Sequence, residues 1–231
     1  MNLAVFHGSP RKGNTYRATG IFLDELKKQE DVKLTEFFLP DALPVFCTGC
    51  QLCLGGPRER CPHTRYVEPI LQAILEADAL LFTTPHHGAC SMSAGMKSLL
   101  DHLDFLTMNV TPRGELFRMK AFILTTATGS AAAIGPIRSY LKNWGVNRVD
   151  ALGIRMFTDK WDKMPEKKRT GLERKLRKRA RRFYALAPGR APVSAVFMYH
   201  MSKMILRKYV GEEAYPYQYW KERGYFDKRP F

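Results

Sequence analysis

Gly8-Ser9-Pro10-Arg11-Lys12-Gly13-Asn14-Thr15 follows a short apolar run at residues 2–6, and this stretch decides the fold. An apolar run that ends at glycine is typical of a buried strand, and apolar residues recur at helical spacing over 15–28. A polar loop between a strand and a helix can direct several backbone N–H groups at an anion. The stretch therefore predicts a phosphate-binding loop near the start of an α/β protein.

The residue types in this loop favour a monophosphate over a longer phosphate chain. Glycines let the backbone approach a ligand closely, short polar side chains supply donors, and cationic side chains add charge. The loop lacks the Gly-Lys-Ser/Thr ending of a nucleoside triphosphate loop and the glycine spacing of the dinucleotide fingerprint. An ordinary polar turn between a strand and a helix is the alternative interpretation. The candidate phosphate-binding residues are Ser9, Arg11, Lys12, Gly13, Asn14 and Thr15.

The first 157 residues alternate between apolar strands and amphipathic helices. We expect strands at 2–6, 32–39, 79–84, 121–126 and 149–157, and helices at 15–28, 67–75, 93–106 and 131–144. Continuous apolar strands separated by helices indicate a parallel sheet covered on both faces. The predicted fold class is therefore a doubly wound, flavodoxin-like α/β sheet of five strands in the order 2-1-3-4-5.

Two more loops follow strands of the predicted sheet and should face the phosphate loop. In open α/β sheets, ligands lie beyond the carboxyl ends of the strands, near the point where the strand order reverses. Small residues after the strand at 121–126 leave room for a planar ring. Metal binding by the paired histidines after 79–84 is disfavoured, because neighbours on one turn seldom ligate one ion together. The candidates are Pro85, His86, His87 and Gly88 in one loop, and Thr126, Ala127, Thr128 and Gly129 in the other.

Together these motifs resemble the NADPH-dependent FMN reductase and iron-sulfur flavoprotein family. The similar features are the loop at 8–15, the Met-Ser-Ala-Gly-Met-Lys run that begins at Met92, and the cysteine segment between them. The resemblance covers residues 1 to about 157. It implies that the loop at 8–15 holds the phosphate of FMN and that the loops at 85–88 and 126–129 border its isoalloxazine ring. His87 stands where relatives often place an aromatic residue.

Four of the five cysteines fall within fifteen residues, at Cys47, Cys50, Cys53 and Cys61. Clustered cysteines in a cytosolic chain indicate metal or redox chemistry rather than a disulfide framework. Three thiolates in C-x2-C-x2-C spacing, with a fourth before proline, match the ligand pattern of a 4Fe–4S cluster. The segment thus predicts such a cluster, which the resemblance also implies. Bare redox-sensitive thiols and a structural zinc ion are the alternatives.

Residues 161–231 form a predicted helical extension, distinct from an FMN-binding domain at 1–160 that carries the cysteine insert at 44–65. The net charge is +15, and residues 159–190 supply +9 of it with thirteen basic and four acidic side chains. Because the rest of the chain is only mildly basic, we expect a local partner surface rather than nucleic-acid binding. A wide apolar face at 193–205 and an aromatic C-terminal segment predict a homodimer or homotetramer.

The predicted function is electron relay. NAD(P)H or a ferredoxin-like carrier would reduce FMN, which would pass electrons to a quinone-like or protein acceptor, with or without the cluster as an intermediate. No side chain is assigned as an acid or base, because the flavin carries the chemistry. A flavin electron carrier or redox sensor without turnover is the alternative, and nucleic-acid or membrane-surface binding is a weaker one. No apolar stretch is long enough for a membrane span, so we expect a cytoplasmic protein.

Overall fold

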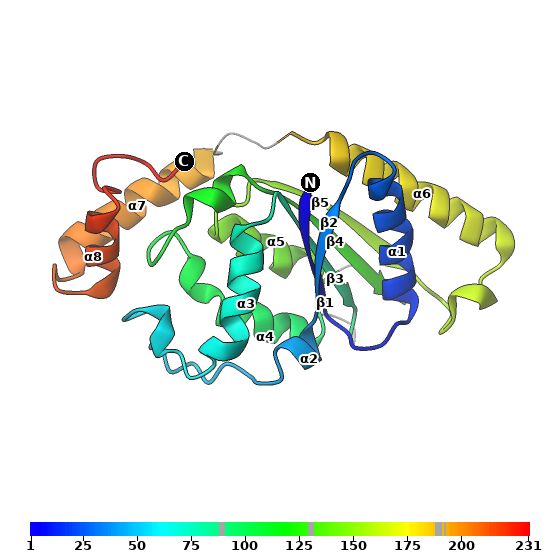
Figure 1. Ribbon diagram of the computed structural model, residues 1–231, viewed down its shortest axis with the longest axis horizontal. Helices are drawn as coiled ribbons and strands as arrows, with labels where there is room; N and C mark the ends of the chain where they lie inside the picture. Colours follow the sequence, from blue (N-terminus) through cyan, green and yellow to red (C-terminus); the bar gives the residue numbers. More distant parts are fainter. Residues whose placement is uncertain (88–90, 129–131, 188–190, 192) are drawn as a thin grey trace.

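The computed structural model describes residues 1–87, 91–128, 132–187, 191 and 193–231, and a five-stranded sheet forms its centre (Figure 1). The strands are β1 (Asn2–His7), β2 (Lys33–Phe38), β3 (Ala79–Pro85), β4 (Lys120–Ala127) and β5 (Arg148–Arg155). Their order is β2-β1-β3-β4-β5, and every neighbouring pair is parallel. The flavodoxin-like topology predicted from the sequence is therefore confirmed.

Helices cover both faces of the sheet, because its strands are apolar on both sides. In β1, Ala4 and Phe6 join one core cluster, whereas Leu3 and Val5 join the other. The first cluster is covered by α3 (Thr64–Leu75), α4 (Ala94–His102) and α5 (Ile134–Asn143), and the second by α1 (Asn14–Lys27) and α6 (Glu166–Ala185). Because all five strands are parallel, their carboxyl ends lie together at one edge of the sheet.

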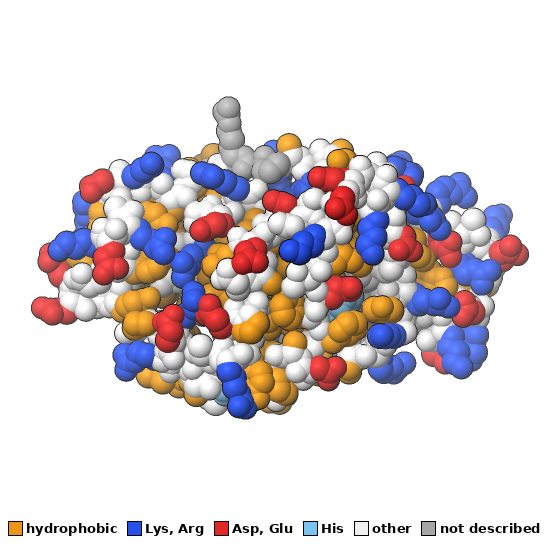
Figure 2. Space-filling model, in the orientation of Figure 1, with side chains coloured by type: hydrophobic (Ala, Val, Ile, Leu, Met, Phe, Trp, Pro, Cys, Tyr) orange, Lys and Arg blue, Asp and Glu red, His pale blue; other side chains and the backbone are white. Residues whose placement is uncertain are grey.

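The basic helix α6 packs beside α1 over the sheet. Its narrow apolar stripe buries Leu176, Ala180 and Phe183 in the same cluster as the α1 side chains. Arg181 also pairs with the buried Glu25 of α1. The cationic residues therefore lie on the outer surface of a helix whose inner stripe belongs to the core, and Lys and Arg side chains gather over α6 at the right of Figure 2.

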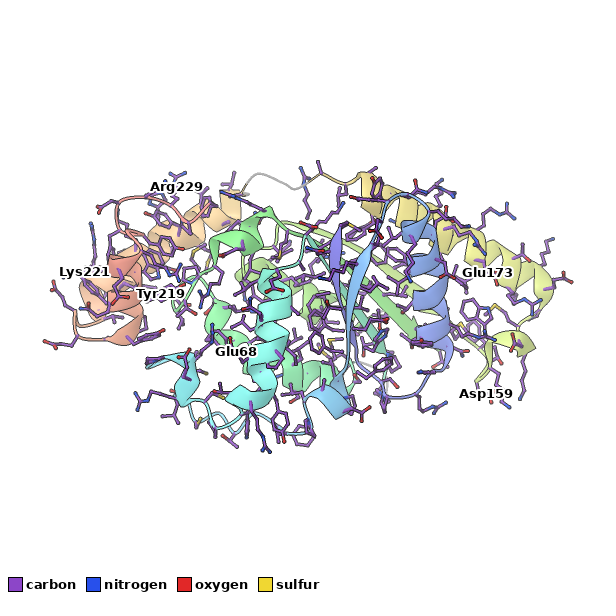
Figure 3. All side chains as sticks on the ribbon, in the orientation of Figure 1. Glu68, Asp159, Glu173, Tyr219, Lys221 and Arg229 are labelled. Atoms are coloured by element: carbon purple, nitrogen blue, oxygen red, sulfur yellow. The ribbon has the colours of Figure 1, made fainter. Side chains whose placement is uncertain are left out.

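The C-terminal helices α7 (Val193–Tyr209) and α8 (Tyr215–Glu222) form a third apolar cluster at the other end of the molecule (Figure 1). The fully buried Trp220 stacks on Tyr199, with ring centroids 5.6 Å apart. Tyr219, labelled in Figure 3, donates its hydroxyl to the Pro112 carbonyl at 3.1 Å and so ties α8 to the body. Much of the aromatic C-terminal segment is thus buried within the chain itself.

Several predicted bounds shift in the structure. The helix expected at 93–106 ends at His102 and is followed by the 3-10 turn η2 (Asp104–Leu106), which still buries Leu106. The helix expected at 131–144 begins at Ile134. The remaining short elements are α2 (Leu39–Ala42), η1 (Arg58–Arg60), η3 (Gly114–Arg118) and η4 (Trp161–Lys163). Among the described helices, none is both long and apolar enough to cross a bilayer.

Candidate functional site at the carboxyl edge of the sheet

Backbone hydrogen bonds join the segments that leave the carboxyl ends of β1, β3, β4 and β5. Gly8 N donates to the Thr83 carbonyl at 2.7 Å, and His86 N donates to the Thr126 carbonyl at 2.8 Å. Met156 N donates to the Ala127 carbonyl at 2.6 Å. The three loops that the sequence selected therefore begin side by side, as the parallel topology requires.

The first turn of α1 leaves its backbone N–H groups available to a ligand. Gly13 occupies the N-cap position, no described side chain accepts a hydrogen bond from the first turn, and that turn contains no acidic residue. A Cβ built on Gly13 would meet no atom within 4 Å, so the space beside it is open. Unpaired N–H groups at a helix N-terminus favour an anion, because they add to the positive end of the helix dipole.

Thr15 connects the phosphate loop to the loop after β4. Its Oγ1 lies 2.6 Å from Oγ1 of Thr126, and both residues are buried. Thr19 Oγ1 donates to the Thr15 carbonyl at 2.9 Å, one turn along α1. The structure thus brings together two candidate residues that are 111 positions apart in the sequence.

The other candidates in the loop have different surroundings. Ser9 Oγ accepts a hydrogen bond from Arg11 N at 3.2 Å, and the Arg11 side chain is exposed. Asn14 Nδ2 donates to the Thr158 carbonyl at 3.0 Å, which anchors the loop to the segment after β5. Lys12 Nζ lies 5.6 Å from the centroid of the Tyr16 ring. Lys12 therefore makes a cation–π contact with Tyr16.

In the loop after β3, the Nε2 atom of His86 is buried and has no hydrogen-bond partner among the described residues. Oγ1 of Thr125 in β4 is also buried without a described partner. Buried polar atoms are usually paired, so an unpaired one at an open edge fits a ligand that supplies the partner. Pro85 is partly buried, whereas His87 and Thr128 are exposed. Gly88 and Gly129 lie outside the described residues.

Sequence reasoning missed Thr84 and Ser93, which hold the loop after β3 in place. Ser93 Oγ caps α4 by accepting a hydrogen bond from Met96 N at 3.3 Å, and Ser93 N donates to Thr84 Oγ1 at 3.1 Å. A Cβ on Gly8 would lie only 2.6 Å from Ser93 Oγ. Gly8 is therefore needed for the close approach of the first loop to the third strand. A serine directly before an apolar helical pattern is an N-cap signal that could have identified Ser93.

His7 ends β1, directly before the phosphate loop, and its side chain contacts both neighbouring strands. Burial lowers the pKa of its imidazole, and this effect outweighs the hydrogen bond and the negative charge of Glu36, which raise it. The neutral ring then donates from Nε2 to Glu36 Oε2 at 2.8 Å, because a carboxylate can only accept. Its Nδ1 is left to accept from Thr83 Oγ1 at 3.2 Å. This network fixes the end of β1 against its two neighbouring strands.

The cysteine segment does not have the geometry of a metal site. In the part of the chain that the structure describes, no group of three or more His, Cys, Asp or Glu side chains is arranged to hold a metal ion. Cys47 and Cys50 are exposed, whereas Cys53 and Cys61 are partly buried. The predicted 4Fe–4S cluster and the zinc alternative are therefore not supported, although the ligand spacing suggested them. Spacing alone does not specify how a loop turns.

The thiols of this segment differ in acidity. The Leu52 N–H and the Thr48 hydroxyl hold the pKa of the exposed Cys50 thiol below its ordinary value. Burial, followed by the charges of Cys61, Cys47 and Cys50, raises the pKa of the Cys53 thiol to about 11. Cys50 is thus the more readily ionised of these two thiols.

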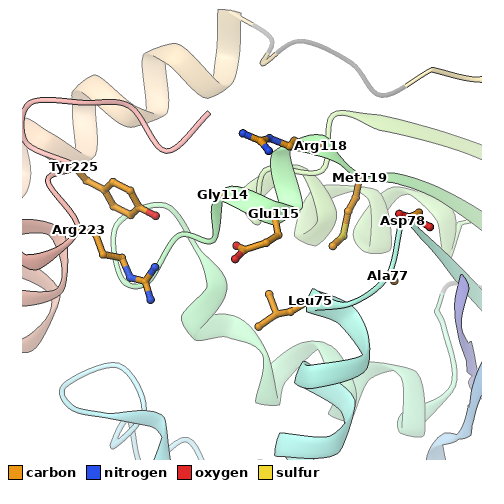
Figure 4. Close-up of a pocket in the computed structure, with 9 residues that line it drawn as sticks. All are labelled: Leu75, Ala77, Asp78, Gly114, Glu115, Arg118, Met119, Arg223 and Tyr225. Carbon is orange, nitrogen blue, oxygen red and sulfur yellow. The ribbon is translucent and has the colours of Figure 1, made fainter. Parts of the chain in front are cut away.

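A separate cavity of about 430 Å³ lies at the opposite end of the sheet (Figure 4). Asp78 and Met119, which directly precede β3 and β4, line it on one side. Arg223 and Tyr225 line it from the segment after α8. Because ligands of open α/β sheets bind at the carboxyl ends of the strands, this cavity is not part of the candidate site.

Comparisons with known proteins agree with the fold. The model of the NADPH-dependent FMN reductase family matches residues 1–156. An azoreductase from Bacillus anthracis str. Sterne superimposes with a TM-score of 0.62 at 16% identity, over 78% of this chain and 98% of that one. An FMN-dependent NADH-azoreductase from Bacillus anthracis str. Ames Ancestor, in complex with FMN, superimposes with a TM-score of 0.59 at 11% identity, over 79% of this chain and 99% of that one.

An NADH:FMN oxidoreductase in its apo form gives a TM-score of 0.56 at 20% identity, over 80% of this chain and 88% of that one. At these identities the structural likeness establishes a shared fold. A comparison with curated proteins gives no match.

Proposed function

The chain belongs to the NADPH-dependent FMN reductase family, and we propose that it binds FMN at the carboxyl edge of its sheet and uses it as an NAD(P)H-dependent oxidoreductase. The observation that carries this proposal is the uncapped first turn of α1, which begins beside the open space at Gly13. A phosphate dianion there would receive backbone N–H groups, and Ser9, Arg11, Asn14 and Thr15 lie within the same loop.

The residues after β3 and β4 suit the ring end of the cofactor. His86 Nε2 is buried and unpaired among the described residues, so it can form a hydrogen bond with a polar ring edge. Thr126 is fixed by Thr15, and Ala127 adds no bulk to the loop that follows. When bound, FMN supplies hydride acceptance from NAD(P)H and electron donation to an acceptor. The chain itself binds the phosphate, orients the ring and shields one of its faces from water.

The acceptor belongs to the finer part of this proposal. We favour a small organic molecule such as a quinone, an azo compound or free flavin. Solved structures with this fold include azoreductases, an NADH:FMN oxidoreductase and a putative quinone reductase from Klebsiella pneumoniae. No step is assigned to an iron-sulfur cluster, because the cysteine side chains do not fit one. The cysteine segment then contributes free thiols, of which Cys47 and Cys50 are exposed.

Steady-state oxidation of NADPH and NADH, with FMN and a quinone or azo acceptor, tests the proposed function. Arg11→Ala should raise the FMN concentration needed for half-maximal rate by about tenfold, because it removes a charge beside the phosphate. Arg17→Ala is the matched control, since Arg17 is also exposed but pairs with Asp162 on the outer side of α1. Absence of FMN-dependent NAD(P)H oxidation, or equal effects of the two substitutions, would contradict the proposal.

A further inference from the structure

A second cavity, of about 680 Å³, lies between the outer edge of β5 and the first half of α6. β5 is an edge strand of the sheet, so no further strand covers this side. Ile154 and Leu172 provide apolar surface in the cavity, and Gly153 adds no side chain. A cavity of this volume matches the size of small-molecule sites in proteins.

The polar part of the lining carries positive charge only. Arg155, Lys163, Lys168 and Lys175 line the cavity, and no Asp or Glu is among its described lining residues. Lys163 pairs with Asp159 at 3.4 Å. The other three cations have no ion-pair partner among the described residues. The cavity therefore keeps at least three uncompensated positive charges next to apolar surface.

Phe157 supplies an aromatic surface at the same place. Phe157 lies two residues beyond the end of β5, and its side chain is 80% exposed. It lies in the lining with Met164 and Pro165, which connect β5 to α6. An aromatic ring that remains in water beside an apolar cavity gains burial when a flat ligand covers it.

A second copy of this chain is a poor occupant. The chain has a net charge of +15, and residues 159–190, six of which line the cavity, contribute +9. Bringing two such surfaces together would place like charges opposite each other, which disfavours association. Charge complementarity therefore favours a small anion, and the apolar part of the lining requires that this anion carry an apolar, flat body.

We propose that this cavity binds a small aromatic anion, meaning a ring system that carries a sulfonate, carboxylate or phosphate group. The ring would lie between Phe157 and Leu172, and the anionic group would lie near Lys168, Lys175 and Arg155. The cavity adjoins the candidate FMN site, because Thr158 in its lining accepts the hydrogen bond from Asn14 of the phosphate loop. Binding here does not depend on the proposed redox activity and can be measured without it.

In Figure 3, Asp159 marks the segment between β5 and α6, which contributes Lys163, Met164 and Pro165 to the lining. The test is isothermal titration calorimetry of the full chain with 1-anilinonaphthalene-8-sulfonate. Its neutral counterpart N-phenyl-1-naphthylamine, which lacks the sulfonate, is the control ligand. We expect one molecule of the sulfonate to bind per chain, and the neutral compound to bind at least about tenfold more weakly.

Matched charge reversals on α6 locate the anionic group. Lys168→Glu with Lys175→Glu should weaken sulfonate binding by about tenfold or more, because both cations line the cavity. Lys167→Glu with Lys178→Glu makes the same change in net charge at exposed positions of the same helix outside the lining, and should change binding by less than about threefold. Equal weakening by the two pairs would show a general charge effect and would overturn the proposal.

Phe157→Ser and Phe197→Ser locate the aromatic contact. Both side chains are largely exposed, at 80% and 60%, so neither substitution should unfold the protein, which circular dichroism can check. Phe157→Ser should weaken binding of the sulfonate probe. Phe197→Ser, on the exposed apolar face of α7, should leave that binding unchanged. If Phe197→Ser alone abolishes binding, the probe binds α7 and the inference fails. Absence of any saturable binding to the unaltered chain would also overturn it.

Discussion

His7 connects the fold to the candidate site at the level of a single residue. It is only 3% exposed, and it ends the strand that leads into the phosphate loop. Its ring stacks on Phe38 with centroids 4.5 Å apart. Because burial lowers its pKa, the folded protein holds it neutral over a range in which the unfolded chain has begun to bind a proton.

The pH dependence of stability should therefore change in His7→Phe, which keeps an aromatic ring but cannot titrate. The folded-state pKa of His7 is below the ordinary 6.5, so its contribution to stability is complete above 6.5 and declines as the pH falls toward the folded-state pKa. One such group changes the slope of the free energy of unfolding against pH by up to about 1.4 kcal/mol per pH unit. Urea unfolding of both proteins from pH 7.5 to 5 measures this slope. The same dependence of unfolding free energy on pH in both proteins would contradict the prediction.

The two cysteines with shifted acidity should differ in reactivity. The pKa of Cys50 is lowered and its side chain is exposed, whereas the pKa of Cys53 is raised to about 11. Since the thiolate is the reactive form, iodoacetamide at pH 7.5 should modify Cys50 well before Cys53. Peptide mass spectrometry over a time course measures both rates. Faster labelling of Cys53 than of Cys50 would contradict the structure of this segment.

At the level of elements, α6 depends on an ion pair with α1. Burial alone would raise the pKa of the Glu25 carboxyl, but the hydrogen bond from Arg181 and the charge of Lys28 hold it below its ordinary value. Glu25→Gln should therefore lower the free energy of unfolding by about 1–3 kcal/mol at pH 7. This loss should diminish as the pH falls through the folded-state pKa of Glu25, because the carboxylate is then protonated in the native protein as well.

Glu173→Gln is the control for this prediction. Glu173 pairs with Arg177 within α6 at 3.4 Å and has no ion pair to another element among the described residues. Its replacement should lower the free energy of unfolding by less than about 1 kcal/mol, as is usual for an ion pair within one helix. Urea unfolding at pH 7 compares the two variants. Equal losses would mean that the pair between α1 and α6 contributes nothing specific.

The strands and the edge that carries the site were predictable, because both follow from local patterns. The apolar runs at 79–84 and 121–126 became β3 and β4, and the parallel order then placed the three loops together. Contacts between distant side chains were not predictable. Asn14 and Thr158 are 144 positions apart, and nothing near either residue indicates the other. The turns of the cysteine segment, with Gly49 and Gln51 at positive φ, likewise follow from no spacing rule.

At the level of the whole molecule, the two ends have different surfaces. The α6 end carries most of the positive charge, whereas α7 exposes an apolar row at the other end, formed by Val193, Phe197 and Met204. The inner side of α7 packs against α8. An exposed row of this kind is consistent with a contact between subunits. The homo-oligomer, the division at residue 160 and the cytoplasmic location remain predictions.

The central claim is that the loop at 8–15 holds a phosphate, and a comparison of FMN with riboflavin tests it most directly. The two ligands share the ring system and differ in the phosphate alone. Fluorescence titration of the purified chain should show one FMN bound per chain, and riboflavin should bind at least about a hundredfold more weakly, because two or more charge-assisted hydrogen bonds are lost. Equal affinity for both ligands, or no uptake of FMN, would contradict the account.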